Sequence, residues 1–576
     1  MSVYTGLPTK RSLGGHLRVF RILVTLFRNH LFENDALTIA YGSEMRAAQV
    51  LGILAVPGLL VSMYLLPEFM NLQFRTGPEV RWQLRTVILF FVAYSFAVTG
   101  FVTVFKWDLL FPDRHDFLAL SPLPIRMRDL FASKLAVLGL FLAAVAICVN
   151  GGSVILLPVF SMFNNQAHAA GVLNVALGQI AACGAAAVFG FFAISALHGT
   201  LVNLLRPSLF RRISPFVQMI TMSSMVLSVL LFPIYSGNMH SIAVMHPGWL
   251  VYFPPYWFVG IYEWFLPEPD PVLKMIGIHG LRAIGVAITL FCVVWIMGYA
   301  RYHDQTLESR YIAERRSRVF FKLYERIRSG FLNSPEERAV FQFTGQTLMR
   351  SSSHRLFLTV YLSVGVSFGL LATLTVGVDP DGLRLSTSPE GLRVLPFLLE
   401  FVVISGLRAA FQFPAELSAN WIFQLADTGW AQASLDATRK RVWVSGMLPI
   451  VISFFPVEIV TFGLGTATFH LIFQSVAGMF LIEGLFWRFD KVPFTCSYFP
   501  GKVNLALLAG LYLYGFTSYS FTMADLERFL ETGFLRSVVF LLVSIAVLRM
   551  ILRNRQPNPR VRFDAYEPEF QTLDLT

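Results

Sequence analysis

Charged residues are scarce in this sequence. Asp, Glu, Lys and Arg make up 14% of its 576 residues, against roughly 25% in an average soluble domain. Hydrophobic residues make up 55%, and the mean hydropathy is +0.60. A soluble fold of this length needs charged side chains over its surface, so the composition excludes that class. Lipid can solvate the apolar surface instead, which predicts an integral membrane protein.

Cysteine is scarce as well, and its spacing argues against a structural zinc site or a disulfide framework. The four cysteines are Cys148, Cys183, Cys292 and Cys496. No two of them form a CxxC pair, and the first three lie in apolar runs, where a thiol packs as a small hydrophobic group. The sequence also lacks an HExxH motif and a catalytic pair of carboxylates at a membrane interface. We therefore expect no catalytic residue, no metal and no cofactor.

A nucleotide-binding motif is missing too. The P-loop needs GxxxxGK[ST], in which backbone amides cradle phosphate and the lysine reaches it. The one Gly-Lys pair is Gly501-Lys502, with Cys496 where the first glycine belongs and Val503 in place of Ser or Thr. Its surroundings, Val492–Lys502, hold two prolines and a glycine, which is typical of a compact structural loop. The chain is not expected to be an enzyme by itself, and an ATP-driven function would require a partner.

A cleavable signal peptide is not expected either, because Arg18, Arg21 and Arg28 interrupt the apolar residues near the N-terminus. Apolar residues recur there at spacings of three and four, which predicts an amphipathic helix over residues 13–31. Its apolar face comprises Leu13, Leu17, Phe20, Val24, Phe27 and Leu31. A basic helix of this kind lies in the inner membrane interface; an ordinary solvated helix is the alternative.

Long apolar runs predict an all-α polytopic membrane protein with about twelve transmembrane helices. The first six runs cover about 48–66, 86–105, 135–160, 172–197, 214–235 and 276–298. The second six cover about 356–378, 394–412, 443–464, 467–487, 503–520 and 535–552. A short Gly463–Thr466 turn separates the ninth run from the tenth.

Positive charge predicts the orientation. Most of the 46 Lys and Arg residues fall in segments that a cytoplasmic N-terminus would place on the inner side, as the positive-inside rule requires. The net charge of +11 therefore belongs to cytoplasmic loops, and a nucleic-acid partner is not expected. We expect both termini in the cytoplasm and the chain in the cell (inner) membrane.

Two tandem six-span units are expected, because the largest basic segment separates six runs from six. Residues 1–300 would form the first unit with its interfacial helix, and 356–576 the second unit with a short cytoplasmic tail. Residues 301–355 would form a basic cytoplasmic linker and a second connecting helix. That helix begins with Ser334-Pro335-Glu336-Glu337, which is typical of an N-cap, a first-turn proline and a capping box. It is predicted to run through Val340, Phe341 and Leu348 into the seventh span.

Each unit has a sizeable cytoplasmic loop after its second span. In the first, Lys106–Lys134, the segment Ser121-Pro122-Leu123-Pro124 forces a turn before a basic helix. Its candidate partner-docking residues are Asp113, Arg114, Asp116, Pro122, Leu123, Pro124, Arg126 and Arg128. Those of the second loop, Phe413–Val442, are Trp421, Arg439, Lys440 and Arg441. Apolar side chains on a cytoplasmic loop indicate a contact, so Phe117–Lys134 is predicted to dock a partner; lipid headgroups are the alternative.

The order of features in Asp113–Lys134 resembles the membrane permease subunits of ABC transporters of the type-two exporter class. The resemblance covers residues 1–300 well and 330–576 in outline, as in fused permeases that carry two such units in one chain. It implies an interfacial helix at the start of each unit and a coupling helix that docks on a separate ATPase subunit. It also implies an outer segment between the fifth and sixth spans that dips back into the membrane, for which Met245–Trp264 is the candidate. Trp249, Tyr256 and Trp257 in that segment are a possible outer gate or a plain interfacial belt.

Ionisable residues within apolar runs leave a second function open. Glu400, Glu458, His470 and Glu483 are costly in a membrane and suggest a proton relay, although local pairing near an interface would also accommodate them. The leading hypothesis is the permease subunit of an ATP-driven exporter. An ion-coupled secondary transporter using Glu458, Glu483 or His470 is the alternative, and an enzyme of lipid-linked substrates is a third. Expected partners are a separate ABC ATPase, membrane lipid and a possible second copy; the substrate, the transport direction and the number of chains stay open.

Overall fold

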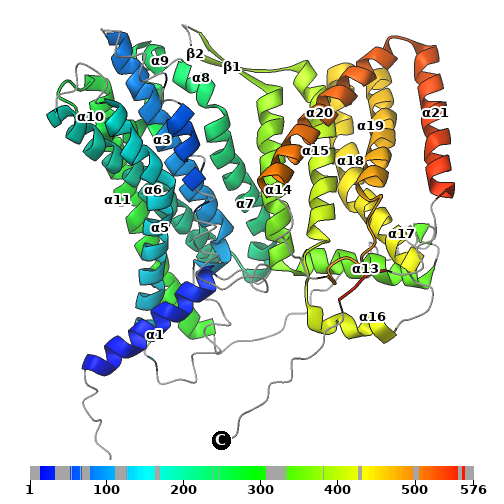
Figure 1. Ribbon diagram of the computed structural model, residues 1–576, viewed down its shortest axis with the longest axis horizontal. Coiled ribbons are helices and arrows are strands. Elements are labelled where there is room, and N and C mark those ends of the chain that lie inside the picture. The colour runs from blue at the N-terminus through cyan, green and yellow to red at the C-terminus, as the bar shows by residue number, and fades with distance from the viewer. Residues whose placement is uncertain are drawn as a thin grey trace, which may run out of the picture. The chain divides into compact units, whose positions relative to one another are not determined.

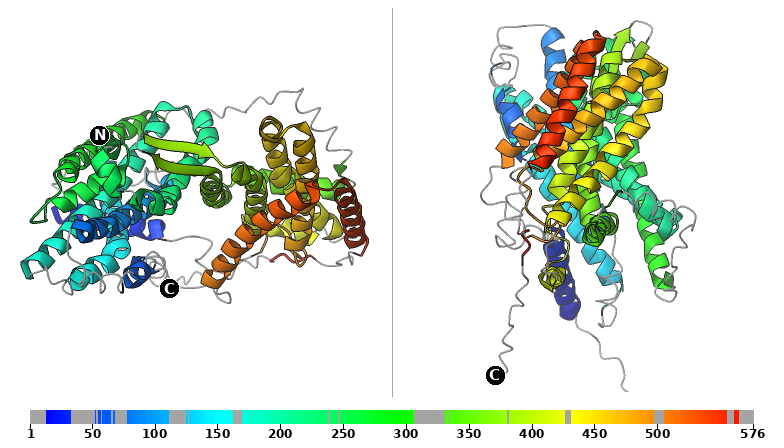
Figure 2. Two further views of the ribbon diagram at one scale, coloured as in Figure 1. Left: turned by 90° about the horizontal axis from the view of Figure 1, so that it is seen from above. Right: turned by 90° about the vertical axis from the view of Figure 1, so that its right-hand side faces the viewer.

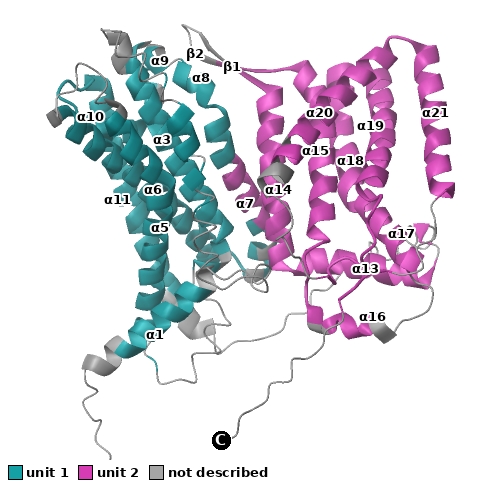
Figure 3. Cartoon of the chain, viewed as in Figure 1, with its two compact units in different colours: residues 1–214, 224–309 teal, residues 215–223, 310–576 magenta. Residues whose placement is uncertain are grey.

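Helices make up nearly all of the computed structural model (Figure 1). It describes residues 13–32, parts of 52–67, 78–110, 125, 127–161, 169–237, 239–245, 247–305, 331–332, 334–379, 382–425, 431–496, 505–554 and 561–564. The chain divides into two units, coloured in Figure 3: unit 1 comprises residues 1–214 and 224–309, and unit 2 comprises residues 215–223 and 310–576.

Nine helices among the described residues are long and apolar enough to cross a membrane. They cover Trp82–Phe105, Arg128–Val159, Gly171–Leu204, Arg212–Leu230, Pro271–Gly298, Ser352–Thr373, Ala431–Phe462, Leu464–Leu485 and Phe534–Arg553. The chain is thus a multi-pass helical membrane protein. Of the other predicted spans, 48–66 is described only in part, and its described residues are helical. The remaining two fall in α15 (Pro389–Ala410), which has charged residues along its length, and α20 (Leu505–Glu531), whose C-terminal half is polar.

Four long helices of unit 1 pack around an apolar core: α3 (Pro78–Phe105), α5 (Met127–Ser161), α6 (Ala169–Leu204) and α11 (Pro271–Gln305). A fifth, α7 (Pro207–Leu230), belongs to both units, because its residues 215–223 are part of unit 2. Phe131 of α5, Phe191 of α6 and Trp295 of α11 belong to this core. Large apolar side chains such as Ile147 and Ile296 are exposed on the outer faces, as expected where lipid is the solvent.

The predicted N-terminal amphipathic helix is present as α1 (Leu13–Phe32). It lies obliquely at the foot of the upright helices of unit 1 and packs on α5 (Figure 1). Leu23 and Phe27 are buried, whereas Ile22 and Leu26 on the opposite side are about half exposed. The Lys134 ammonium of α5 lies 5.2 Å from the centre of the Phe27 ring. Of the predicted apolar face, Phe27 is buried and Val24 packs partly buried against the same core, whereas the buried Leu23 was not among the predicted residues.

Unit 2 begins with a helix that lies across the foot of its bundle. Helix α13 (Pro335–Arg350) starts as predicted: the Ser334 hydroxyl accepts a hydrogen bond from the Glu337 amide, and Pro335 occupies the first turn. It does not run into the seventh span. The chain turns at Ser351, whose backbone is extended, and α14 (Ser352–Thr373) stands upright from there (Figure 1). The Ser351 side chain caps α14 and contacts His354 Nδ1 at 2.7 Å, so a new helix begins where one continuous helix was expected.

A two-stranded hairpin departs from the all-helical expectation. Strand β1 (Leu374–Asp379) pairs antiparallel with β2 (Gly382–Thr387), with Leu374 opposite Thr387 and Asp379 opposite Gly382. The predicted seventh span, 356–378, therefore ends as a helix at Thr373. The β-branched residues Thr375, Val376 and Val378 favour the extended strand, and the Asp-Pro-Asp-Gly sequence that joins the strands is rich in turn formers.

In the bundle of unit 2, α20 crosses obliquely beside α15 (Figures 1 and 2). The remaining helices of unit 2 belong to the same bundle. They are α17 (Ala431–Val442), a π-helical segment η4 (Trp443–Met447), α18 (Leu448–Phe462), α19 (Leu464–Leu485) and α21 (Phe534–Arg553). The segments α17, η4 and α18 form one continuous run. Gly463, with φ +85, separates it from α19. The predicted break between the ninth and tenth spans is confirmed, but it is one residue long, because Leu464–Thr466 already belong to α19.

Candidate functional site

The segment predicted to dip back into the membrane forms two short helices in unit 1, of which the second is buried. Residues Pro247–Val251 form η2, and α10 (Pro254–Glu263) follows. Every residue of α10 except Pro254 and Trp257 is buried, because α10 packs against α3, α6 and α11. A Cβ on Gly260 would overlap the backbone of Gly277 in α11, so this crossing depends on two glycines.

A buried ion pair fixes the C-terminal end of α10. The Arg85 guanidinium of α3 donates to both carboxylate oxygens of Glu263, at 2.7 and 3.0 Å, and the two side chains are 7% and 0% exposed. Glu263 Oε2 also accepts from the Asp270 amide at 2.7 Å. Asp270 Oδ1 in turn accepts from the amides of Val272 and Leu273, which caps α11. The pair therefore joins α3, α10 and α11.

The possible outer-gate residues are held by hydrogen bonds within unit 1. The Tyr256 hydroxyl donates to the Tyr235 carbonyl at 3.0 Å, and its side chain is 2% exposed. Trp257 Nε1 lies 3.1 Å from the Leu250 carbonyl and 2.9 Å from that of Val251. The side chain of Trp249 lies outside the described residues. These contacts favour an anchoring role for Tyr256 and Trp257.

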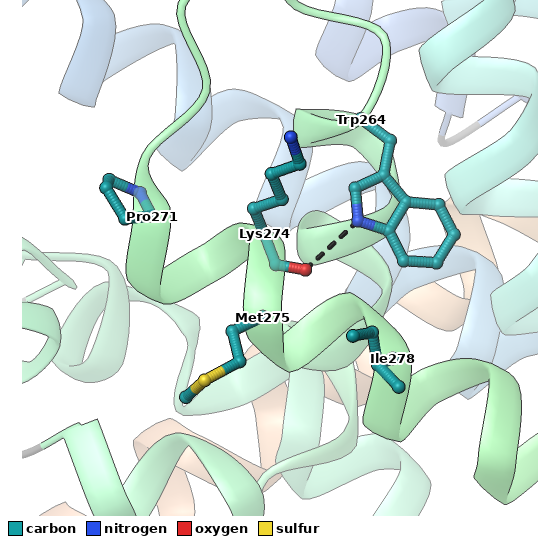
Figure 4. Close-up of a pocket in the computed structure, with 5 residues that line it drawn as sticks. All are labelled: Trp264, Pro271, Lys274, Met275 and Ile278. Carbon is teal, nitrogen blue, oxygen red and sulfur yellow. Dashed lines mark hydrogen bonds between the residues drawn. The ribbon is translucent and has the colours of Figure 1, made fainter.

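A shallow hollow of about 570 Å³ lies where α10 leads into α11. Figure 4 shows its lining, Trp264, Pro271, Lys274, Met275 and Ile278, with Trp264 Nε1 donating to the Lys274 carbonyl at 3.0 Å. Lys274 is its one charged side chain. A small-molecule site needs several convergent polar groups, so this hollow is a weak candidate.

The first predicted docking loop is described at its ends. Asp113, Arg114, Asp116, Pro122, Leu123, Pro124 and Arg126 all lie outside the described residues. Arg128, in the first turn of α5, is exposed. At the start of the loop, Trp107 is fully buried and stacks on His198 with ring centres 4.4 Å apart. In the second half of the loop, Ile125 packs against the core of unit 1.

The second docking loop presents apolar side chains on a short helix. Helix α16 (Trp421–Leu425) lies beneath α13 in Figure 1, at the end of unit 2 opposite the β1–β2 hairpin. Trp421 and Ile422 are 57% and 54% exposed. Phe423 faces inward instead, against Phe343 of α13 at a ring-centre distance of 5.6 Å.

Asn420, the residue before α16, fixes this helix in place. Its side-chain amide donates to the carbonyls of Thr495 and Asp564, at 2.7 and 2.8 Å. A parallel bridge joins Lys491 to Arg562, which ties residues 561–564 to the loop that follows α19. The described part of Val492–Lys502 is therefore a packed structural segment. Burial raises the pKa of the Cys496 thiol, whose largest perturbation is the loss of solvent.

The basic cluster of the second loop contacts other parts of unit 2. Lys440 Nζ lies 2.6 Å from Glu337 Oε1 and donates to the Phe331 carbonyl at 2.8 Å. The Arg441 guanidinium lies 4.5 Å from the centre of the Phe341 ring. Arg439 donates to the Phe486 carbonyl at 3.2 Å. These contacts join α17 to α13 and to the end of α19. Of the four predicted docking residues of this loop, Trp421 is the one whose side chain is largely exposed.

A buried polar cluster occupies the hairpin end of unit 2. His470 Nδ1 of α19 lies 2.8 Å from Glu527 Oε2 of α20, and its Nε2 lies 3.3 Å from Glu458 Oε1 of α18. The three side chains are 2%, 0% and 3% exposed. The His470 ring meets the Phe397 ring of α15 edge on, with centres 5.0 Å apart.

Two further charged residues complete this cluster, which we call the His470 cluster (Arg393, Glu458, His470, Glu527 and Glu531). Arg393 Nη1 lies 2.6 Å from Glu531 Oε2 and 3.8 Å from Glu527 Oε1. Three carboxylates thus face one guanidinium and one imidazole inside an apolar bundle. Such an arrangement can hold and exchange protons. Among the described residues no group of three or more His, Cys, Asp or Glu side chains has metal-binding geometry.

The sequence analysis singled out Glu458 and His470 and missed the other three members of the cluster. Arg393 lies one residue before a predicted span, and Glu527 and Glu531 lie beyond the predicted end of another, so none of the three falls within a predicted apolar run. Of the other two ionisable residues, Glu483 lies 3.9 Å from Arg439 Nε, whereas Glu400 is completely buried in α15. Comparison with known proteins gave no match to a family model, a curated sequence or a solved structure.

Proposed function

We propose that this chain is the membrane-spanning subunit of an ATP-driven ABC-type exporter, energised by a separate ATPase subunit. Each unit opens with an amphipathic helix, α1 or α13, that lies across the foot of its bundle. Unit 1 has a short buried helix, α10, between its fifth and sixth predicted spans. In this proposal ATP hydrolysis on the partner moves the cytoplasmic loops, and the bundles shift to open a path outward.

The observation that carries the proposal is α16. Two large apolar side chains, Trp421 and Ile422, are exposed on a helix that Asn420 holds rigidly at the foot of unit 2. Exposed apolar patches indicate a contact surface, and a fixed helix loses little conformational entropy when it binds. The predicted topology places this end in the cytoplasm, where an ATPase subunit would dock.

Substitution of the α16 surface tests the proposal. We expect the Trp421→Asp/Ile422→Asp variant to lose a P-loop ATPase that co-purifies with the tagged wild-type chain. Leu385→Asp is the matched control, because Leu385 is 71% exposed on β2 at the opposite end of unit 2, and it should retain the ATPase. Equal retention by both variants would remove the evidence for docking at α16.

Ion-coupled secondary transport is the second candidate, and the His470 cluster favours it. Chains of buried Glu and His side chains serve as proton relays in membrane transporters. Under this function, Glu458→Gln should abolish proton-coupled uptake into vesicles while the protein stays folded. Uptake that depends on ATP and is unchanged by Glu458→Gln would favour the exporter instead.

A further inference from the structure

Glu400 is a buried carboxyl group with no visible partner. It lies near the middle of α15, and its side chain is 0% exposed. Neither Oε1 nor Oε2 has a hydrogen-bond partner among the described residues. Native proteins seldom leave a buried acceptor unpaired, so this group needs an explanation that the His470 cluster does not supply.

The surrounding helices leave room for this carboxyl group. A Cβ on Gly478 of α19 would overlap Glu400 Oε1, and it would lie 2.6 Å from Met447 Sδ. Met447 ends the π-helical segment η4, and π-helical turns inside α-helices occur frequently at functional sites. A small residue and an irregular turn therefore meet at Glu400, within a bundle that is otherwise closely packed.

Among the described residues, no neighbouring cation compensates a negative charge at this position. Arg393 and Arg408 on the same helix are each about two turns away, or roughly 10 Å along the axis. Arg393 pairs with Glu531 at 2.6 Å, and Arg408 donates to the Tyr512 hydroxyl at 3.3 Å. An unpaired carboxylate in an apolar interior costs several kcal/mol or more, and such groups take up a proton instead.

The geometry points to Glu400 as a proton-binding site in the interior of unit 2, reached from the hairpin end through the His470 cluster. His470, Gln474 and Gly478 follow one another at intervals of four on one face of α19, and all three are buried. Gln474 Nε2 lacks a hydrogen-bond partner among the described residues. The polar side chain of Gln474 thus lies between the His470 imidazole and the Glu400 carboxyl group. The ligand of the proposed site is a proton.

The titratable groups on neighbouring helices agree with this assignment. Helix α20 contributes Tyr519, which is close enough to interact electrostatically with Glu400 and whose hydroxyl is buried and unpaired among the described residues. The others lie further along the bundle: Tyr361 of α14, against Gly406, and the members of the His470 cluster on α15, α18, α19 and α20. No basic side chain among these packs against Glu400.

Infrared spectroscopy of the purified chain in lipid nanodiscs tests the site. The wild type at pH 7 should show a protonated-carboxyl C=O band that shifts in D₂O. The band should vanish in Glu400→Gln and persist in Glu390→Gln, which changes an exposed carboxylate on the same helix. The isosteric glutamine should leave the unfolding midpoint unchanged. If Glu400→Gln instead removes an ionised-carboxylate band, Glu400 carries a charge or binds a cation, and the assignment is overturned.

The rate of hydrogen–deuterium exchange tests the route independently. Gln474→Leu removes the polar side chain between His470 and Glu400 with little change in volume. It should slow the D₂O shift of the Glu400 band at least tenfold without removing the band. An unchanged rate would overturn the proposed route. Both arms read a proton at Glu400 directly, so their outcome does not depend on whether the chain works with an ATPase.

Discussion

At the residue scale, the Arg85–Glu263 pair is a buried, bidentate ion pair in unit 1. Both carboxylate oxygens accept from the guanidinium, and one of them also accepts from the Asp270 amide. A buried ion pair of this kind adds little to the stability of the fold compared with two apolar side chains of the same volume. Removal of one partner is nevertheless strongly destabilising, because the other charge remains buried without a counter-charge.

Glu263→Gln should therefore destabilise the protein by about 3–5 kcal/mol, measured as a fall in the thermal unfolding midpoint in detergent. Glu390→Gln is the control: Glu390 pairs with Arg528 at 3.1 Å on the surface, where an ion pair is worth about 0–1 kcal/mol. An additional Arg85→Met change should restore part of the loss. A midpoint unchanged by Glu263→Gln would show that the pair does not hold α10.

The Cys496 thiol should react slowly with alkylating reagents. Burial raises its pKa, so less thiolate is present at pH 7.5 and alkylation should accelerate as the pH rises. We expect maleimide labelling, followed by peptide mass spectrometry, to be at least tenfold slower than at an exposed cysteine introduced by Arg488→Cys. Equal rates at the two positions would mean that the segment around Asn420 opens readily in solution.

At the element scale, the break between α18 and α19 depends on one backbone conformation. Gly463 has φ +85 and ψ 163, a region that is essentially restricted to glycine. The backbone conformation of Gly463 therefore lets the chain reverse direction between α18 and α19 within a single residue.

Gly463→Ala should cost about 1–3 kcal/mol in the free energy of unfolding, since alanine is strained in that conformation. Gly465→Ala is the matched control two residues later, because Gly465 is helical and a Cβ there meets nothing within 4 Å. The control should be neutral or slightly stabilising. Equal effects of the two substitutions in thermal unfolding would mean that φ at Gly463 is not what fixes the turn.

Features encoded locally were predictable from the sequence. The Ser334 cap, the Gly463 break and the helix over residues 13–31 depend on neighbours within one or two turns. The break at Ser351 was also readable, because Ser351–Ser353 supplies N-cap residues, but the apolar residues on both sides suggested continuity. The partners of His470 were not predictable, since packing brings Glu527 to it from 57 positions away.

At the scale of the whole molecule, the predicted topology determines which end of each bundle faces the cytoplasm. A reporter fused after Gly237 should be periplasmic, and one fused after Gly330 cytoplasmic, by paired alkaline phosphatase and fluorescent-protein fusions. Positive charge in the linker between the two units motivates this orientation. The reverse result at either site would contradict the topology and would place α16 on the wrong side for an ATPase.

The most direct test of the proposed function is the ATP hydrolysis of the native complex. The tagged chain, purified from its own membranes, should bring with it a P-loop ATPase subunit and hydrolyse ATP. The chain purified alone after expression in a different host should neither bind nor hydrolyse it. Native mass spectrometry would give the subunit composition of the active fraction. Purification of the chain from its own membranes without an ATPase, or micromolar ATP binding by the chain alone, would contradict the account.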